Sequence, residues 1–280
     1  MKNLSEKALI GILIIILMFL CKNIENCKKI HNKAISMAVS DFYHSMERLL
    51  LLAKQPLGKT MYIWGGGWNE EDTGAGAEAV TLGVSPKWEK FALKQDKNYD
   101  FNATRYQIHD GLDCSGYMGW LVYNLMETED GKPGYVVSSS KMAKFLAEKG
   151  FGEYTESSKV EDWQPGDIMS MEGHVWMALG SCEDGSVVVL HASPPGVTLS
   201  GTVLSNGDES KAVKLAKTYM KKYYPKWYEK YGVKACGYEY LTDSDQMRWS
   251  EELLKDRYQL RRKKAEDVLE WMFGKIQVEY

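Results

Sequence analysis

The sequence predicts an α+β fold, in which N-terminal helices pack on an antiparallel sheet. Segments with helical periodicity come first along the chain, and short runs rich in Val, Ile and Met follow them, separated by Glu-Gly and Asp-Gly turns. The chain has 280 residues, of which 44% are hydrophobic and 26% are charged. This composition is that of a globular protein, and the length suits one generous domain or two small ones.

The N-terminus resembles an export signal. Lys2 and Lys7 precede an unbroken apolar stretch at 8–21, and no small-x-small cleavage site follows it. We therefore interpret residues 1–27 as a signal anchor, with a cleaved signal peptide as the alternative. A buried core helix is less favoured, because the stretch is apolar on every face. Either interpretation places the remainder of the chain outside the cytoplasm.

The first half of the chain alternates helical and irregular segments. Residues 33–54 have the apolar spacing of an amphipathic helix, which Pro56 should end. A short aromatic segment at 61–67 then runs into three glycines. Residues 68–110 are polar and punctuated by glycine, so we expect a long insertion with a short helix near 88–93.

Two further helices and a sheet are predicted next. Helices are expected at 114–127 and 139–149. Strands are expected at 167–171, 174–179 and 186–192, with a further candidate at 197–204. The last part of the chain should be mostly helical, at 209–224 and 251–273, with Pro225 ending the first of these helices. The domain prediction is a core at 28–205 and a C-terminal extension at 206–280, packed on that core.

The five cysteines include no CxxC pair and no zinc-type spacing. Cys182 and Cys236 lie in apolar surroundings and are interpreted as buried, inert thiols. Cys114 differs, because it stands where a polar loop meets an apolar helix. Free N–H groups at a helix start stabilise a thiolate and can hold an oxyanion, so Cys114 is the candidate nucleophile.

Two histidines are predicted to lie near each other on neighbouring strands. The Asp184-Gly185 turn should fold the two strands antiparallel, which places His174 and His191 on one face and the apolar residues between them on the other. His174 can then act as a base that His191 orients. The competing interpretation is a zinc site made by Cys114, both histidines and His109.

The total charge gives no sign of nucleic-acid binding, since the formal net charge is −3. The nine Trp and seventeen Tyr are more informative. Such residues can line a groove for an extended polar ligand, or they can simply fill the core.

Taken in order, the motifs resemble those of the NlpC/P60 cell-wall peptidases. They read Tyr62-Ile63-Trp64-Gly65-Gly66, Asp113-Cys114-Ser115-Gly116, Pro165-Gly166-Asp167, His174-Val175 and His191-Ala192. The match covers the chain from about residue 35 to about residue 200, and its specificity comes from five motifs in the same order rather than from any one of them.

The resemblance implies a papain-like fold and hydrolysis of peptidoglycan stem peptides without a metal or other cofactor. By position it implies Cys114 as nucleophile, His174 as base and His191 as the third member of a triad. Tyr62, Asp113 and Ser115 match positions that contact substrate or support the nucleophile. The bond implied is that between D-glutamate and a diamino acid.

The chain departs from the family pattern at the 68–110 insertion and at the C-terminal extension. The insertion leaves both the bond that is cleaved and the shape of the substrate groove open. The alternatives are a thiol-dependent amidase or acyltransferase of the cell envelope, or a non-catalytic wall-binding domain. No protein partner can be named.

Overall fold

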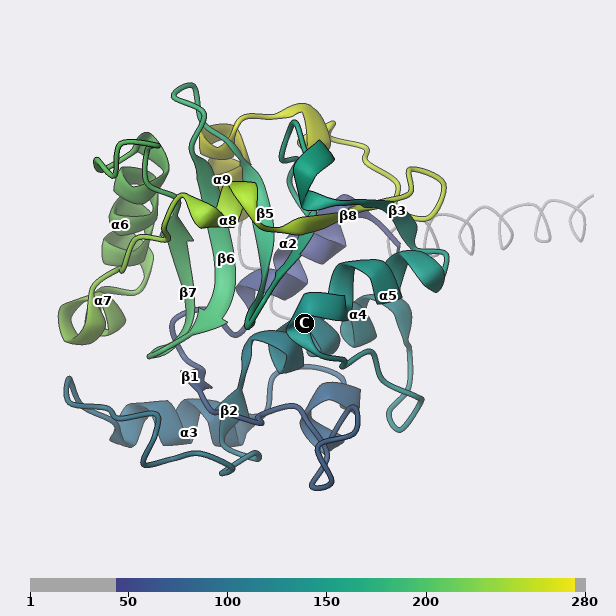
Figure 1. Cartoon of the computed structure of the whole chain (residues 1–280). Coiled ribbons are helices and arrows are strands. Elements are labelled where there is room, and N and C mark those ends of the chain that lie inside the picture. The colour runs from purple at the N-terminus through teal and green to yellow at the C-terminus, as the bar shows by residue number, and fades with distance from the viewer. Residues whose placement is uncertain (1–43, 275–280) are drawn as a thin grey trace, which may run out of the picture. The chain divides into compact units, whose positions relative to one another are not determined.

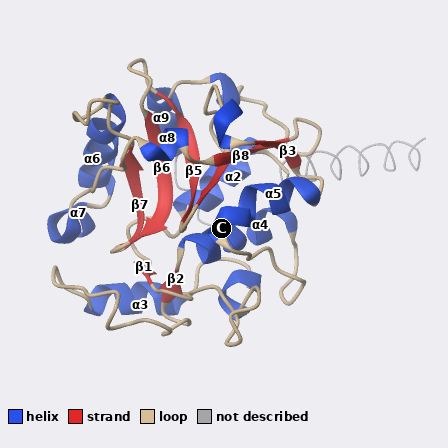
Figure 2. Ribbon diagram, viewed as in Figure 1, coloured by secondary structure: helices blue, strands red, loops and turns tan. Residues whose placement is uncertain are grey.

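The computed structural model describes residues 44–274. The predicted signal anchor at 1–27 and the first part of the predicted helix at 33–54 lie outside the described residues. The described part is a mixed α+β fold, with one eight-stranded sheet and helices α2 to α9 (Figures 1 and 2). The predicted α+β class is therefore confirmed, whereas the papain-like form of it stays a prediction. Within 44–274, no helix is both long enough and apolar enough to cross a bilayer.

The sheet has the strand order β2-β1-β7-β6-β5-β4-β8-β3. Its strands are β1 (Met61–Tyr62), β2 (Gly111–Leu112), β3 (Gly152–Thr155), β4 (Ile168–Met171), β5 (His174–Ser181), β6 (Val187–Ser193), β7 (Gly196–Gly201) and β8 (Asp245–Trp249). Neighbouring strands are antiparallel except β1 and β2, which are parallel. The predicted strands correspond to β4, β5, β6 and β7, whereas β1, β2, β3 and β8 were not expected.

The helices are α2 (Met46–Lys54), α3 (Pro86–Lys94), α4 (Cys114–Met126), α5 (Met142–Glu148), α6 (Lys211–Tyr223), α7 (Pro225–Tyr231), α8 (Glu239–Thr242) and α9 (Ala265–Gly274). Serine caps begin three of them, because the side chains of Ser45, Ser85 and Ser210 accept backbone N–H groups of α2, α3 and α6. Pro225 stands at the first position of α7, where its missing N–H costs nothing.

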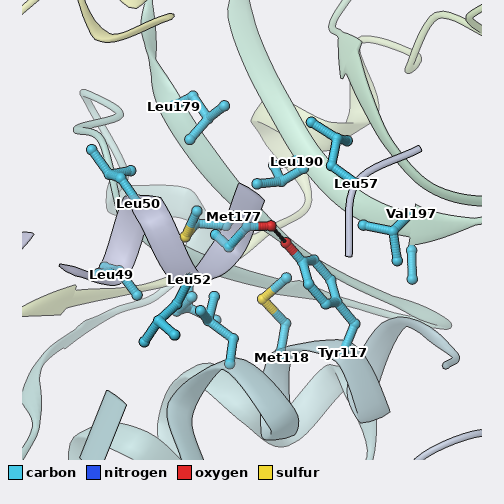
Figure 3. Packing of buried hydrophobic residues seen from close by; sticks show 14 of the residues in the cluster. Leu49, Leu50, Leu52, Leu57, Tyr117, Met118, Met177, Leu179, Leu190 and Val197 are labelled. Atoms are coloured by element: carbon cyan, nitrogen blue, oxygen red, sulfur yellow. Dashed lines mark hydrogen bonds between the residues drawn. The ribbon is translucent and has the colours of Figure 1, made fainter. Parts of the chain in front are cut away.

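Helix α4 forms the centre of the main core. Its residues from Cys114 to Leu125 are buried, and the helix packs against α2 on one side and β5 and β6 on another. Figure 3 shows Tyr117 and Met118 of α4 facing Leu50 and Met177. The Tyr117 hydroxyl donates to the Ala53 carbonyl at 2.6 Å, so the one polar atom of this large side chain is satisfied in an apolar region.

The C-terminal extension completes the sheet. β8 pairs with β4 on one side and with β3 on the other, and α9 packs on β5. The predicted helix at 251–273 is wrong over its first half, since α9 begins only at Ala265. The Asp256 carboxylate accepts the N–H groups of Leu260 and Arg261, and this local bonding replaces a helix start.

Both faces of the central strands are covered. The face with Val175, Met177 and Leu190 belongs to the main core, as predicted. The opposite face carries a second apolar cluster that includes Trp176 and Leu241, the latter from α8. The face that carries the histidines is therefore covered by the C-terminal extension. Figure 1 shows α8 and the chain that leads to β8 crossing in front of β5 and β6.

Candidate active site

The start of α4 is held by the Asp113 carboxylate. One oxygen accepts the N–H of Gly116 at 2.7 Å and the Ser115 hydroxyl at 2.9 Å, and the other accepts the N–H of Gly65 at 3.1 Å. Asp113 is thus the N-cap of α4 and also ties the glycine turn to it. Burial raises the pKa of Asp113 to about 6, against the lowering effect of these bonds.

Glycines allow the turn and the helix to touch. A Cβ on Gly116 would lie 1.9 Å from the Gly66 carbonyl oxygen, and one on Gly67 would lie 2.5 Å from the Cα of Gly116. Gly67 also has a positive φ of 92°, which side chains other than glycine rarely adopt. One close approach between the glycine turn and the start of α4 therefore explains Gly67 and Gly116, and it fixes Cys114 relative to that turn.

The Cys114 thiol is buried, with 6% of the residue exposed. Burial raises its pKa to about 12, and the nearby Asp113 charge adds to this, while backbone N–H groups of Val175 and Ser115 act in the opposite direction. The effect of the Val175 N–H indicates that the thiol lies near the start of β5, where Val175 directly follows His174. At neutral pH the resting group is a thiol, so nucleophilic attack requires a base.

The structure brings His174 and His191 into direct contact. The distance between His174 Nε2 and His191 Nδ1 is 2.9 Å, and the rings meet edge to face with centroids 5.1 Å apart. This bond occupies Nε2 of His174 and leaves Nδ1 as the nitrogen available to a reacting group. Burial lowers the pKa of His174 to about 4, and burial together with His174 holds the pKa of His191 well below its usual range. Both rings are neutral at pH 7, as a base requires.

Tyr62 lies at the same site. Its carbonyl accepts the Tyr99 hydroxyl at 2.7 Å, and its ring meets Phe101 edge to face at 5.7 Å. Burial raises the pKa of the Tyr62 phenol, followed by the charges of Cys114 and Asp113. The phenol is therefore within electrostatic reach of the candidate nucleophile and stays protonated.

Two parts of the 68–110 insertion reach this site. The Trp68 indole N–H donates to the Ser115 hydroxyl at 2.9 Å, and Tyr99 and Phe101 hold Tyr62 as described. A hollow of about 470 Å³ lies beside these residues. Its lining consists of Gly65, Trp68, Asn69, Glu70, Asp72 and the run 106–110.

Sequence reasoning missed Tyr240. Its ring lies against His174 at 5.6 Å and against His191 at 6.2 Å between centroids, and its phenol interacts with the thiols of Cys236 and Cys114. The general richness in Tyr was the only signal available, because the contact depends on how the chain after α7 returns over the sheet. Cys182 and Cys236 are buried, and burial raises the pKa of each thiol to about 11.

The zinc interpretation gains no support from the geometry. His109 binds Glu78 instead, with 2.7 Å between its Nδ1 and the carboxylate. Within residues 44–274, no group of three or more His, Cys, Asp or Glu side chains is arranged to hold a metal ion.

Comparison of the chain with models of protein families, with curated proteins and with solved structures found no match.

Proposed function

We propose that this chain is an exported or membrane-anchored cysteine endopeptidase that hydrolyses peptide bonds of bacterial peptidoglycan, in a papain-like fold of the NlpC/P60 type. Cys114 is the nucleophile, His174 the base and His191 its orienting partner. The observation that carries the proposal is the 2.9 Å contact between His174 and His191. Val175, which follows His174 on β5, lowers the pKa of the Cys114 thiol through its backbone N–H, and this supports a position of the thiol near the histidine pair. The order of these elements supports the fold type, because the cysteine helix precedes the histidine strands.

The proposed reaction follows from this arrangement. His174 Nδ1 takes the thiol proton as the Cys114 sulfur bonds to the substrate carbonyl carbon, and the resulting oxyanion is held by N–H groups at the start of α4. The oxyanion collapses and the C–N bond breaks, while the protonated His174 gives its proton to the departing amine. Water then attacks the thioester and transfers a proton to His174. The C–S bond breaks to release the acid, and His174 returns the proton to the departing Cys114 sulfur.

The site also supports the proposed roles of the residues that contact substrate or support the nucleophile. Tyr62, Asp113 and Ser115 surround the nucleophile, and Trp68 extends the surface beyond Ser115. The substrate is a stem peptide, and the bond is that between D-glutamate and a diamino acid.

Digestion of purified peptidoglycan by the chain, with mass spectrometry of the released fragments, tests the function. Cleavage between D-glutamate and the diamino acid is expected, and it must disappear in Cys114→Ala. Release of intact stem peptides from the glycan would indicate an amidase, and new amide bonds would indicate an acyltransferase. Binding to the wall without any fragment would leave only a wall-binding domain.

A further inference from the structure

A second cavity borders His191. Its volume is about 140 Å³, and it is enclosed by the ends of β6 and β7, by α7 and by the chain leading to α8. Its lining includes His191 and Tyr240, so it borders the candidate active site. At roughly 30 Å³ for each water molecule, the space holds a group of about four or five non-hydrogen atoms.

Buried donors without acceptors line this cavity. Trp227 is 6% exposed, and no group of the described residues accepts a hydrogen bond from its indole N–H. The Tyr231 hydroxyl is likewise buried without a partner among these residues, and its ring meets that of Trp227 at 4.9 Å. An indole nitrogen can only donate, and a buried donor without an acceptor destabilises the folded chain. An acceptor bound beside these two residues would give the donors a partner.

The charge of the lining specifies the kind of acceptor. Lys234 is at the cavity, and no Asp or Glu is among the described residues that line it. Burial, with smaller effects of Asp96 and Tyr99, raises the pKa of Tyr231 to about 12, so its hydroxyl remains a donor at neutral pH. Neither of these two neighbours is part of the lining. Three donors, one of them cationic, suit a carboxylate.

We propose that this cavity binds a carboxylate group, held by Trp227, Tyr231 and Lys234 beside His191. The carboxylate belongs either to the end of a substrate peptide, in which case the inference rests on the proposed function, or to a free small acid. The volume of the cavity admits only the carboxylate and the one or two atoms bonded next to it. The contact with His191 and Tyr240 places the bound group next to the residues that orient the base.

The test follows the indole N–H signal of Trp227 by ¹⁵N NMR on Cys114→Ala protein, so that the result does not depend on turnover. The signal is assigned by its loss in Trp227→Phe. N-acetyl-D-alanine is the probe, and its neutral amide is the matched control. We expect a saturable shift with the acid only, no shift of the exposed Trp64, and about tenfold weaker binding in Lys234→Ala.

Equal shifts with the acid and the amide, or no saturable shift with either, would overturn the carboxylate site. The two sources are separated by kinetics on the active chain. A substrate end in the cavity predicts a higher KM for a C-terminally amidated stem peptide than for the free acid. A free small acid predicts equal KM values for the two peptides. Absence of any turnover would refute the proposed function but leave the NMR result intact.

Discussion

The ring of Tyr240 packs against the imidazole of His174 with 5.6 Å between centroids, although Tyr240 belongs to the C-terminal extension and His174 opens β5. The same ring contacts His191 and Trp176. It therefore covers the histidine pair on the side away from the main core. Because a base works only within a narrow range of orientations, the extension contributes to the geometry of the proposed site.

Replacing Tyr240 by alanine should lower kcat by about tenfold to a hundredfold, because the imidazole loses the ring that limits its rotation. Tyr240→Phe keeps the ring and should restore most of the kcat. Tyr238→Ala is the matched control, since Tyr238 is exposed and directly precedes the same short helix. Steady-state kinetics with thermal melting distinguish positioning from folding. Equal kcat in the alanine and wild-type proteins would contradict this role.

Cys114→Ala should abolish turnover while the fold is kept, because the change removes only the sulfur at the tip of α4. Cys182→Ala should retain activity, since that thiol is buried away from the histidines. Release of peptidoglycan fragments by each variant is measured against circular dichroism of the same samples. The assignment of the nucleophile fails if Cys114→Ala turns over at a near-normal rate.

The sequence was sufficient for the elements that follow local rules. The helix from Cys114 to Met126 is an apolar run that begins directly after Asp113, a good N-cap residue, and β5 and β6 flank a turn with Asp184 and Gly185. The meeting of His174 and His191 followed from this pairing and the two-residue period of strands. These features could be predicted from local sequence, because none of them depends on a segment that is far away in the chain.

The remaining elements depend on distant partners. Asp245–Trp249 has no strong strand pattern and becomes β8 only because β4 and β3 lie on either side of it. The covering of the histidines by Tyr240 has the same origin. The 251–264 part of the predicted α-helix does not form, because the Asp256 side chain competes for backbone N–H groups. The periodicity of apolar residues does not reveal this competition.

Gly116→Ala should destabilise the protein by more than about 2 kcal/mol and remove activity, because its Cβ would lie 1.9 Å from the Gly66 carbonyl oxygen. Gly74→Ala is the control, since a Cβ there meets no atom within 4 Å. Its effect should stay within about 0.5 kcal/mol. Urea unfolding of both variants measures the difference. Similar midpoints for the two would show that the turn and the helix tip do not touch.

The acidic limb of kcat/KM should lie well below the usual histidine value. A base is active while neutral, so activity is lost as the pH falls through the pKa of His174, which burial lowers to about 4. Asp113 titrates nearby, because burial raises its pKa to about 6. Asp113→Asn removes that group. When kcat/KM of Asp113→Asn is scaled to its own maximum, the midpoint of its acidic limb should therefore lie below a pH of about 5.

A limb near pH 6.5 in both the wild type and Asp113→Asn would mean that the essential base is an exposed histidine, and it would reject His174. A limb near pH 6 that vanishes in Asp113→Asn would assign that limb to the carboxylate and leave the base in place. Kinetics over the full range should be accompanied by melting curves, so that loss of fold is not counted as loss of base.

Trp68 connects the 68–110 insertion to the proposed site through the Ser115 hydroxyl, which in turn donates to Asp113. Trp68→Phe removes this indole N–H and part of the half-buried indole ring, so the free energy of unfolding should fall by about 1–2 kcal/mol. The hydroxyl then loses a fixed neighbour at the edge of the hollow beside the site. Since an extended substrate uses that edge and a small one does not, cleavage of intact peptidoglycan should fall several-fold more than cleavage of a dipeptide ester.

Trp64→Phe is the control for this comparison, because Trp64 is exposed and its ring lies under the guanidinium of Arg105 rather than against Ser115. It should change the two rates by similar factors. If Trp68→Phe also lowers both rates equally, Trp68 only supports the helix tip. If it changes neither rate, the insertion does not shape the groove. A selective loss on intact peptidoglycan is the outcome that assigns the insertion to substrate binding, because the ester still reports an intact Cys114 and His174.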